Sequence, residues 1–246
     1  MFSFFRKKNI LMEVDIHSHL IPNIDDGAKD MEEAIMLIKE LSSLGYKKLI
    51  TTPHINDLFQ NKKNDIITRY LILKNELIKR KIQIKLELGA EYYIDDFFRE
   101  LLGKERLLSF GDKNYLLFEF SYFTEPRDIE NLIYDIILEG YTPLLAHPER
   151  YIYWHNNFNQ YQKLKEMGVF FQLNLNSIGG FYNKDIRNIA EKLIKNSYID
   201  FIGSDTHHLK HIKHLKKSLS LSFYQKIFKY NTILNDTLMY NSIHKK

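Results

Sequence analysis

Short apolar runs and amphipathic segments alternate along the whole of this sequence. The apolar runs predict seven buried strands, over residues 13–16, 48–52, 84–88, 115–120, 143–146, 169–173 and 199–202. Strands that alternate with helices usually pair in parallel, through right-handed crossover connections. The pattern therefore predicts an α/β fold, built either as an open doubly wound sheet or as a barrel.

Residues that favour helix ends mark several of the amphipathic segments. Asp30, with Glu33 three positions later, resembles a capping box at a helix start, and Gly45 is typical of the position after a helix end. The tail after Asp205 is rich in helix-forming residues, and we expect helices there, including one near residues 230–239. Such helices supply the crossover connections that parallel strands need.

The composition is that of a single globular domain. The chain has 246 residues, of which 44% are apolar, and no linker or low-complexity tract divides it. We therefore predict an N-terminal extension over residues 1–12 and one domain over residues 13–246. The net charge of +4 includes no long basic block, so nothing indicates nucleic-acid binding.

Two further features concern the environment of the protein. No apolar run reaches the roughly 18–20 residues that span a bilayer, and the initial "MFSFFRKKN" lacks the residue order of a signal peptide. We therefore expect a cytoplasmic protein without a transmembrane segment. The chain also has no cysteine, which excludes disulfides and cysteine-nucleophile phosphatases. Any metal ion must then be held by His, Asp and Glu, a donor set that suits manganese, iron, zinc or magnesium.

Metal-binding side chains accompany the ends of six of the seven expected strands. Active sites of α/β barrels form at the carboxyl ends of parallel strands, so these side chains should meet at one edge. They are His17, His19 and Asp26 after the first strand, His54 after the second, Glu91 after the third, Glu119 in the fourth, His147 after the fifth, and Asp205 and His207 after the seventh. A single histidine at a strand end is more often structural than a ligand. Six strand ends together favour a metal site at the mouth of a closed or distorted barrel.

The spacing of the first two histidines has a direct structural meaning. Residues at positions i and i+2 of a strand point to the same face, so His17 and His19 can reach one cation while Ser18 points away. By contrast, we interpret His208, His211 and His214, which lie three apart, as a polar helix face rather than as a second site.

The motifs "DIHSHLIPNIDDG", "TTPH", "GAE", "FEF", "AHPER" and "SDTH" resemble those of a known superfamily, the polymerase and histidinol phosphatase (PHP) domain. More closely, they are similar to the bacterial metal-dependent protein-tyrosine phosphatases of capsule and exopolysaccharide operons. The resemblance extends from about residue 14 to at least residue 207. The "IDDG" and "AHPER" elements are its most specific parts, because the wider superfamily varies there.

This resemblance implies a distorted seven-stranded TIM-like barrel that binds three divalent metal ions, most often manganese. The ligands that it implies are His17, His19, Asp26, His54, Glu91, Glu119, His147, Asp205 and His207. It places the ligand on Asp26 rather than on Asp25, and it makes Arg150 the residue that contacts the substrate phosphate. Close pairs of divalent metals lower the pKa of a bridging water, which supplies hydroxide at neutral pH for in-line attack on phosphorus.

The implied substrate is phosphotyrosine in the tail of a membrane-associated tyrosine kinase that controls polysaccharide export. Aromatic residues in 120–123 and 150–154 flank the expected site, where they could stack on a phosphotyrosine ring or simply pack the barrel. One alternative is histidinol phosphate or another small phosphomonoester. Two others are a nucleic-acid phosphoesterase, which the weak net charge disfavours, and a silent scaffold, which the complete ligand pattern disfavours. The sequence leaves the oligomeric state open.

Overall fold

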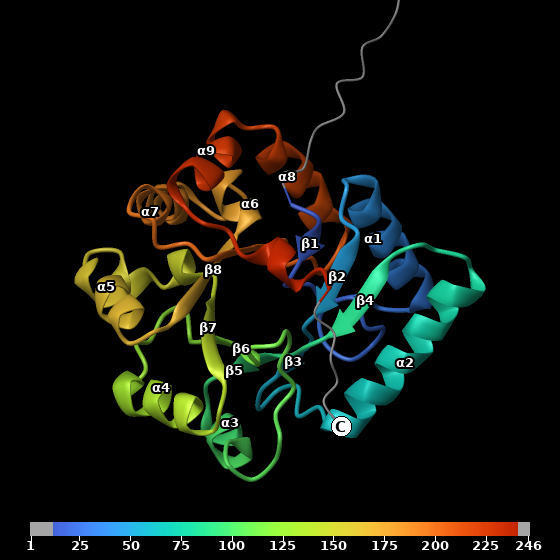
Figure 1. Ribbon diagram of the computed structural model, residues 1–246, viewed down its shortest axis with the longest axis horizontal. Helices are drawn as coiled ribbons and strands as arrows, with labels where there is room; N and C mark the ends of the chain where they lie inside the picture. Colours follow the sequence, from blue (N-terminus) through green and yellow to red (C-terminus); the bar gives the residue numbers. More distant parts are fainter. Residues whose placement is uncertain (1–11, 241–246) are drawn as a thin grey trace, which may run out of the picture.

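The computed structural model describes residues 12–240 of the chain (Figure 1). Strands lie around the centre, and most of the helices surround them (Figure 1). The helices are α1 (Met31–Ser43), α2 (Lys63–Lys79), α3 (Asp96–Leu101), α4 (Ile129–Leu138), α5 (Asn159–Glu166), α6 (Leu175–Ile178), α7 (Lys184–Lys195), α8 (Leu209–Leu219) and α9 (Ser222–Tyr230). Short 3₁₀ helices cover Pro148–Arg150, Ile152–Trp154 and Asn235–Leu238. The expected N-terminal extension lies outside the described residues except for Met12, which is buried.

The strands form two parallel sheets within the described part of the chain. One sheet has the order β1-β2-β4, with β1 (Val14–Asp15), β2 (Lys48–Thr51) and β4 (Lys85–Leu88). The other has the order β3-β5-β6-β7-β8-β9, with β3 (His54–Ile55), β5 (Glu91–Tyr93), β6 (Tyr115–Glu119), β7 (Thr142–Ala146), β8 (Phe170–Asn174) and β9 (Phe201–Gly203). The α/β class with parallel pairing is confirmed, whereas the distorted seven-stranded TIM-like barrel is not, because the described residues form nine strands in two sheets.

The difference in strand number comes from two short strands, β3 and β5, which lie beyond the ends of the second and third expected strands. A break before Pro53, which has no N–H to donate to a ladder, separates β2 from β3. A break at Gly89, where a Cβ atom would lie 2.8 Å from the Phe110 ring, separates β4 from β5. After these breaks β3 and β5 pair with each other, so that His54 stands opposite Glu91. The breaks thus place two of the predicted ligands side by side.

One contact joins the first and last strands near their carboxyl ends. Ser18 and Thr206 form an isolated parallel bridge, in which the His19 N–H donates to the Thr206 carbonyl at 2.9 Å. The Asp205 N–H donates to the His17 carbonyl at 2.8 Å. The bridge therefore holds the two histidine-containing segments next to each other.

Helix ends follow the sequence at some positions and not at others. Asp30 caps α1 by accepting a hydrogen bond from the Glu33 N–H at 2.9 Å, and Gly45 beyond the helix end has φ +115°. The prediction of a helix near residues 230–239 is wrong, because α9 ends at Tyr230 and only the short 3₁₀ helix over Asn235–Leu238 follows in this segment. Leu238 and Met239 from that segment instead join a buried apolar cluster with the strand residues Val14 and Leu144.

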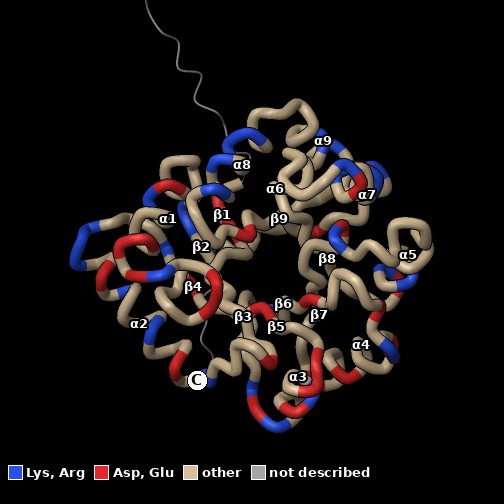
Figure 2. Tube along the Cα trace, turned by 180° about the vertical axis from the view of Figure 1, so that it is seen from behind, with Lys and Arg blue, Asp and Glu red and all other residues tan. Residues whose placement is uncertain are grey.

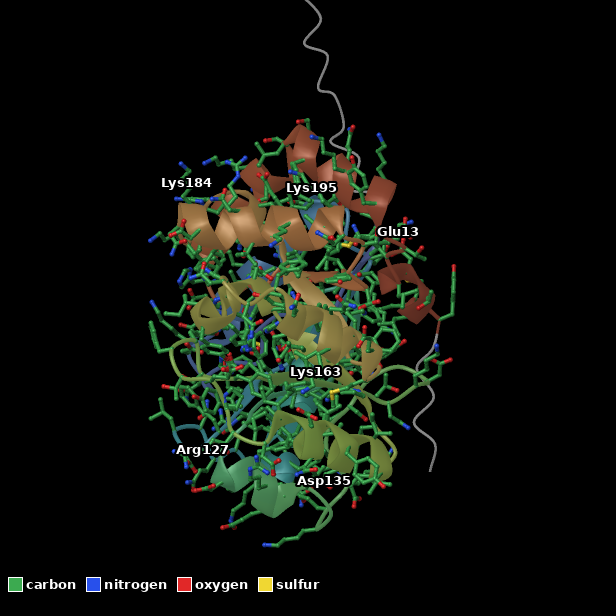
Figure 3. All side chains as sticks on the ribbon, turned by 90° about the vertical axis from the view of Figure 1, so that its left-hand side faces the viewer. Glu13, Arg127, Asp135, Lys163, Lys184 and Lys195 are labelled. Atoms are coloured by element: carbon green, nitrogen blue, oxygen red, sulfur yellow. The ribbon has the colours of Figure 1, made fainter. Side chains whose placement is uncertain are left out.

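The carboxyl ends of the strands face one side of the molecule. In a side view, Arg127 and Lys184 lie on one side and Glu13 lies on the other (Figure 3). Arg127 follows β6 and Lys184 begins α7 after β8, whereas Glu13 precedes β1. Basic and acidic residues both occur around the peripheral helices (Figure 2). Among the described helices, none has the length and apolar character needed to cross a membrane.

Candidate metal centre

Histidine and carboxylate side chains gather at the carboxyl ends of the strands. Among residues 12–240 they form four overlapping groups, and within each group the ligand atoms lie within 4.8 Å of one another. The groups are His19, Asp26, His54 and His207; His17, His19 and Asp205; His17, Glu91 and His147; and His54, Glu91 and Glu119. All nine side chains expected from the sequence are therefore brought together, from six strand ends and the loops that follow them.

Two of these side chains are held by unusual backbone conformations. His147 has φ +34° and Asp205 has φ +49°, in the left-handed region that residues other than glycine rarely adopt. Such strain persists only where the surrounding structure enforces it, and it is concentrated at functional sites. The turns after β7 and β9 therefore aim these two side chains into the cluster at a cost in backbone energy.

The first histidine pair has the donor arrangement of metal ligands. His17 Nδ1 lies 2.7 Å from Gln172 Oε1, and His19 Nδ1 lies 2.8 Å from Asp25 Oδ2. Both Nδ1 atoms must carry protons to bond these acceptors, so each ring in its neutral, metal-binding form presents a lone pair at Nε2. The two Nε2 atoms are 3.2 Å apart. Two facing Nε2 lone pairs repel each other unless a cation lies between them. The geometry therefore fits a metal ion bound at the two Nε2 atoms, with the hydrogen bonds at Nδ1 orienting the rings, as is usual for histidine ligands.

Glu91 is the central carboxylate of the cluster. Its Oε2 lies 3.0 Å from His17 Nε2 and 3.3 Å from His54 Nδ1, and its Oε1 lies 3.0 Å from His147 Nε2. Burial opposes ionisation, but His17 and His54 outweigh it and hold the pKa of Glu91 well below its usual range. The side chain is thus an anion that three imidazoles surround.

The pKa values of neighbouring groups are displaced in opposite directions. Burial disfavours the imidazolium of His17, but the carboxylates of Glu91 and Asp205 raise its pKa to about 10. Burial and then Glu91 raise the pKa of Glu119 to about 7. Burial and then Arg150 lower the pKa of His147 to about 4. These opposite shifts arise because many ionisable groups lie close together, and a cation bound among them would change their pKa values.

The two neighbouring aspartates have different surroundings. Asp25 is buried and accepts hydrogen bonds from His19 Nδ1, from the His54 N–H at 3.0 Å and from the Gly27 N–H at 3.0 Å. Asp26 is 61% exposed, and its Oδ1 lies 3.4 Å from His207 Nε2. Asp25 therefore orients a histidine, while Asp26 reaches into the cluster, where its Oδ1 faces His207 and His54.

A cavity of about 550 Å³ opens onto the cluster. Its walls include Arg150, Tyr122, Tyr182 and Phe59 beside the candidate ligands. Arg150 Nη1 donates to Asp205 Oδ2 at 3.3 Å. The volume lies within the range of small-ligand sites, so one substrate side chain can contact the cluster and Arg150 together.

Several residues that contact the candidate ligands or line the cavity were not predicted from the sequence. Asn174 at the end of β8 donates to Asp205 Oδ2 at 2.7 Å. Gln172 and Tyr182 carried no signal, because their contacts come from distant segments. His208 and His211 line the cavity, so they are more than a polar helix face.

The flanking aromatic residues divide between the cavity and the core. Phe120, Tyr151 and Trp154 are buried in the apolar core. Tyr122 lines the cavity, and Phe123 is 78% exposed. Most of this aromatic cluster therefore packs the fold, and Tyr122 is the member that borders the site.

Comparisons with known proteins agree with this geometry. Residues 13–239 match the family described as capsular polysaccharide synthesis, CpsB/CapC. The tyrosine-protein phosphatase YwqE of Bacillus subtilis (strain 168) is 33% identical over 198 residues, which are 80% of this chain and 78% of YwqE. The putative tyrosine-protein phosphatase CapC of Staphylococcus aureus is 30% identical over 207 residues, which are 84% of this chain and 81% of CapC.

A solved structure gives the same result for the fold. It comes from the crystal structures of YwqE from Bacillus subtilis and CpsB from Streptococcus pneumoniae, described as unique metal-dependent tyrosine phosphatases. The match has a TM-score of 0.77 and 30% identity, and it covers 89% of this chain and 96% of that chain. The present chain therefore belongs to the CpsB/CapC family of capsular polysaccharide synthesis.

Proposed function

We propose that this protein is a metal-dependent protein-tyrosine phosphatase that acts on a tyrosine kinase of capsular or exopolysaccharide synthesis. Its family and its relatives, which are named as tyrosine phosphatases, support the activity. The observation that carries the proposal is the facing pair of Nε2 atoms in His17 and His19, 3.2 Å apart among buried carboxylates. Bound cations would stabilise such an arrangement, whereas packing in an apolar core would not.

The overlapping donor groups support three divalent ions, most often manganese, with iron, zinc or magnesium as alternatives. We assign His17, His19, Asp26, His54, Glu91, Glu119, His147, Asp205 and His207 as their ligands. Bound there, the ions would lower the pKa of water and neutralise charge on a phosphoryl group.

The side chains of the protein have separate roles in this proposal. Arg150 binds the phosphoryl oxygens, because its planar N–H donors match their geometry. Asn174 and Arg150 both donate to Asp205 Oδ2, which leaves Oδ1 directed toward His17 Nε2, 3.5 Å away. Gln172 and Asp25 hold the two histidine rings in the ligating tautomer.

The phenol leaving group of phosphotyrosine needs less help from a general acid than an alkoxide leaving group does. A tyrosine phenol has a pKa of roughly 10 and leaves as a phenolate more readily than a serine alkoxide does. This property favours a phosphotyrosine substrate.

The test is a paired turnover assay with manganese, on a tyrosine-rich phosphotyrosine peptide and on histidinol phosphate. We expect kcat/KM for the peptide to exceed that for histidinol phosphate by about a hundredfold or more, which is roughly 2.7 kcal/mol in transition-state binding. A preference for histidinol phosphate would contradict the proposed substrate and leave the metal site intact. Elemental analysis of the loaded protein tests the three-metal assignment separately.

A further inference from the structure

The guanidinium of Arg150 lies between two tyrosine rings. Its Cζ atom is 4.1 Å from the centroid of Tyr122 and 4.4 Å from the centroid of Tyr182. The three residues come from distant parts of the chain: Tyr122 follows β6, Arg150 ends a 3₁₀ helix after β7, and Tyr182 precedes α7. The arginine side chain is only 18% exposed.

Each tyrosine is tied to a candidate metal ligand through its hydroxyl. The Tyr122 O–H donates to Glu119 Oε2 at 2.8 Å. The Tyr182 oxygen accepts a hydrogen bond from Asn174 Nδ2 at 2.9 Å, and that amide also donates to Asp205 Oδ2. The two rings are therefore anchored to opposite parts of the cluster, and they cannot turn without breaking these bonds.

We propose that Tyr122 and Tyr182 are positioning residues that clamp the Arg150 guanidinium for the substrate phosphate. A guanidinium is planar, and its five N–H donors lie in that plane. Cation–π contact with Tyr122 and Tyr182 holds the guanidinium in place, and it uses none of the N–H donors, so these stay open for in-plane bidentate bonding.

The hydrogen bonds of Arg150 agree with this role. Within residues 12–240 its guanidinium makes one side-chain hydrogen bond, the 3.3 Å contact with Asp205. That contact is long for a charge-assisted bond, which is typically 2.7–2.9 Å. The ring clamp therefore orients the group, and most of its donors are available to an incoming anion.

The same geometry determines which faces of the two tyrosine rings are available to the substrate. Tyr122 and Tyr182 each have a face committed to Arg150, so that face does not stack on a phosphotyrosine ring. This inference rests on the proposed phosphatase function, in which Arg150 contacts phosphate. It adds that the aromatic residues at the site act through the arginine.

A double-mutant cycle tests the clamp. We expect Tyr182→Leu to lower kcat/KM for the phosphotyrosine peptide about tenfold with unchanged manganese content, and Tyr182→Phe, which keeps the ring, to retain most of it. Arg150→Ala should lower kcat/KM by about 100-fold or more, as removal of a preorganised donor does. In the Arg150→Ala background, Tyr182→Leu should cause no further loss. An equal tenfold loss in both backgrounds would overturn the clamp.

A second measurement separates the clamp from the phosphatase activity. The affinity of the manganese-loaded protein for inorganic phosphate can be measured by calorimetry. Measuring it for the same set of variants gives a double-mutant cycle that does not depend on turnover. If the parent protein fails to hydrolyse the peptide, the proposed function fails, and the phosphate cycle still supports or overturns the clamp. Tyr122→Leu takes the place of Tyr182→Leu if the latter does not fold.

A matched control uses a tyrosine that stacks with a cation away from the site. Tyr240 is 84% exposed, and its ring lies 5.1 Å from Lys85 Nζ. Tyr240→Leu should leave both phosphate affinity and turnover unchanged. A loss as large as that of Tyr182→Leu would mean that the effect does not depend on Arg150.

Discussion

Asp25 offers a sharp test of the metal centre because it touches the candidate ligands without belonging to their groups. Its Oδ2 accepts from His19 Nδ1 at 2.8 Å and from the His54 N–H at 3.0 Å, and its Oδ1 accepts from the Gly27 N–H at 3.0 Å. Asp25→Asn keeps the shape of this side chain and replaces one acceptor oxygen by an NH₂ donor. Every one of the three partners donates, so either orientation of the amide creates a conflict.

The cost depends on which way the amide turns. With NH₂ toward the Gly27 N–H, one hydrogen bond of the loop is lost, and the proton on His19 Nδ1 stays in place. With NH₂ toward His19, the imidazole proton moves to Nε2, the atom that faces His17. Loss of such an outer partner typically lowers metal affinity 10–100-fold, or about 1.4–2.8 kcal/mol. We expect a value near the lower limit for the first orientation and near the upper limit for the second.

The assay is a manganese titration in which electron paramagnetic resonance measures the concentration of free ion. Asp30→Asn is the matched control, because Asp30 caps α1 and Asn caps a helix as well as Asp. The control should bind manganese like the parent protein. Equal affinity and stoichiometry for Asp25→Asn and the parent would refute the assigned tautomer of His19 and, with it, the main argument for a cation between the two rings.

Three further predictions address the site and its support. Asp205→Ala and His207→Ala should each lower turnover by more than the roughly 10–100-fold effect of an outer partner while circular dichroism stays native; normal turnover in either would refute its assignment as a ligand. Gly27→Ala should weaken manganese binding about tenfold or more, because its Cβ would lie 2.3 Å from the His19 carbonyl oxygen; unchanged binding would show that the loop adjusts freely. Burial raises the pKa of Asp15 from 3.8 to about 6, so the folded state holds this proton more tightly, and the free energy of unfolding should fall by roughly 2 kcal/mol between pH 4 and 6. Asp15→Asn should lack this fall in urea titrations of the metal-free protein, and parallel profiles for the two proteins would contradict it.

Much of the site could be anticipated from local pattern. Short apolar runs and capping residues such as Asp30 indicate where elements begin and end. Parallel strands share one direction, so side chains that follow them must gather at one edge. His17, His54 and Glu91 lie together in the structure for that reason.

Other features depend on contacts that no local pattern contains. His17 meets Gln172 across 155 positions, and Arg150 meets Tyr182 across a 3₁₀ helix, α5, β8 and α6. The break at Gly89 depends on the Phe110 ring that lies against it. The sequence shows that these residues exist but does not show that they touch.

The sequence by itself determined the α/β class, the parallel direction of the strands and the donor types available to a metal. Periodicity and backbone chemistry act over a few residues, and they are legible without the fold. Only the tertiary structure decided the split into two sheets, the hydrogen bonds on Nδ1 of His17 and His19, and the contacts of Arg150 with Tyr122 and Tyr182. These properties arise where side chains from distant segments are packed against one another, and packing selects one arrangement among many that the same local pattern allows.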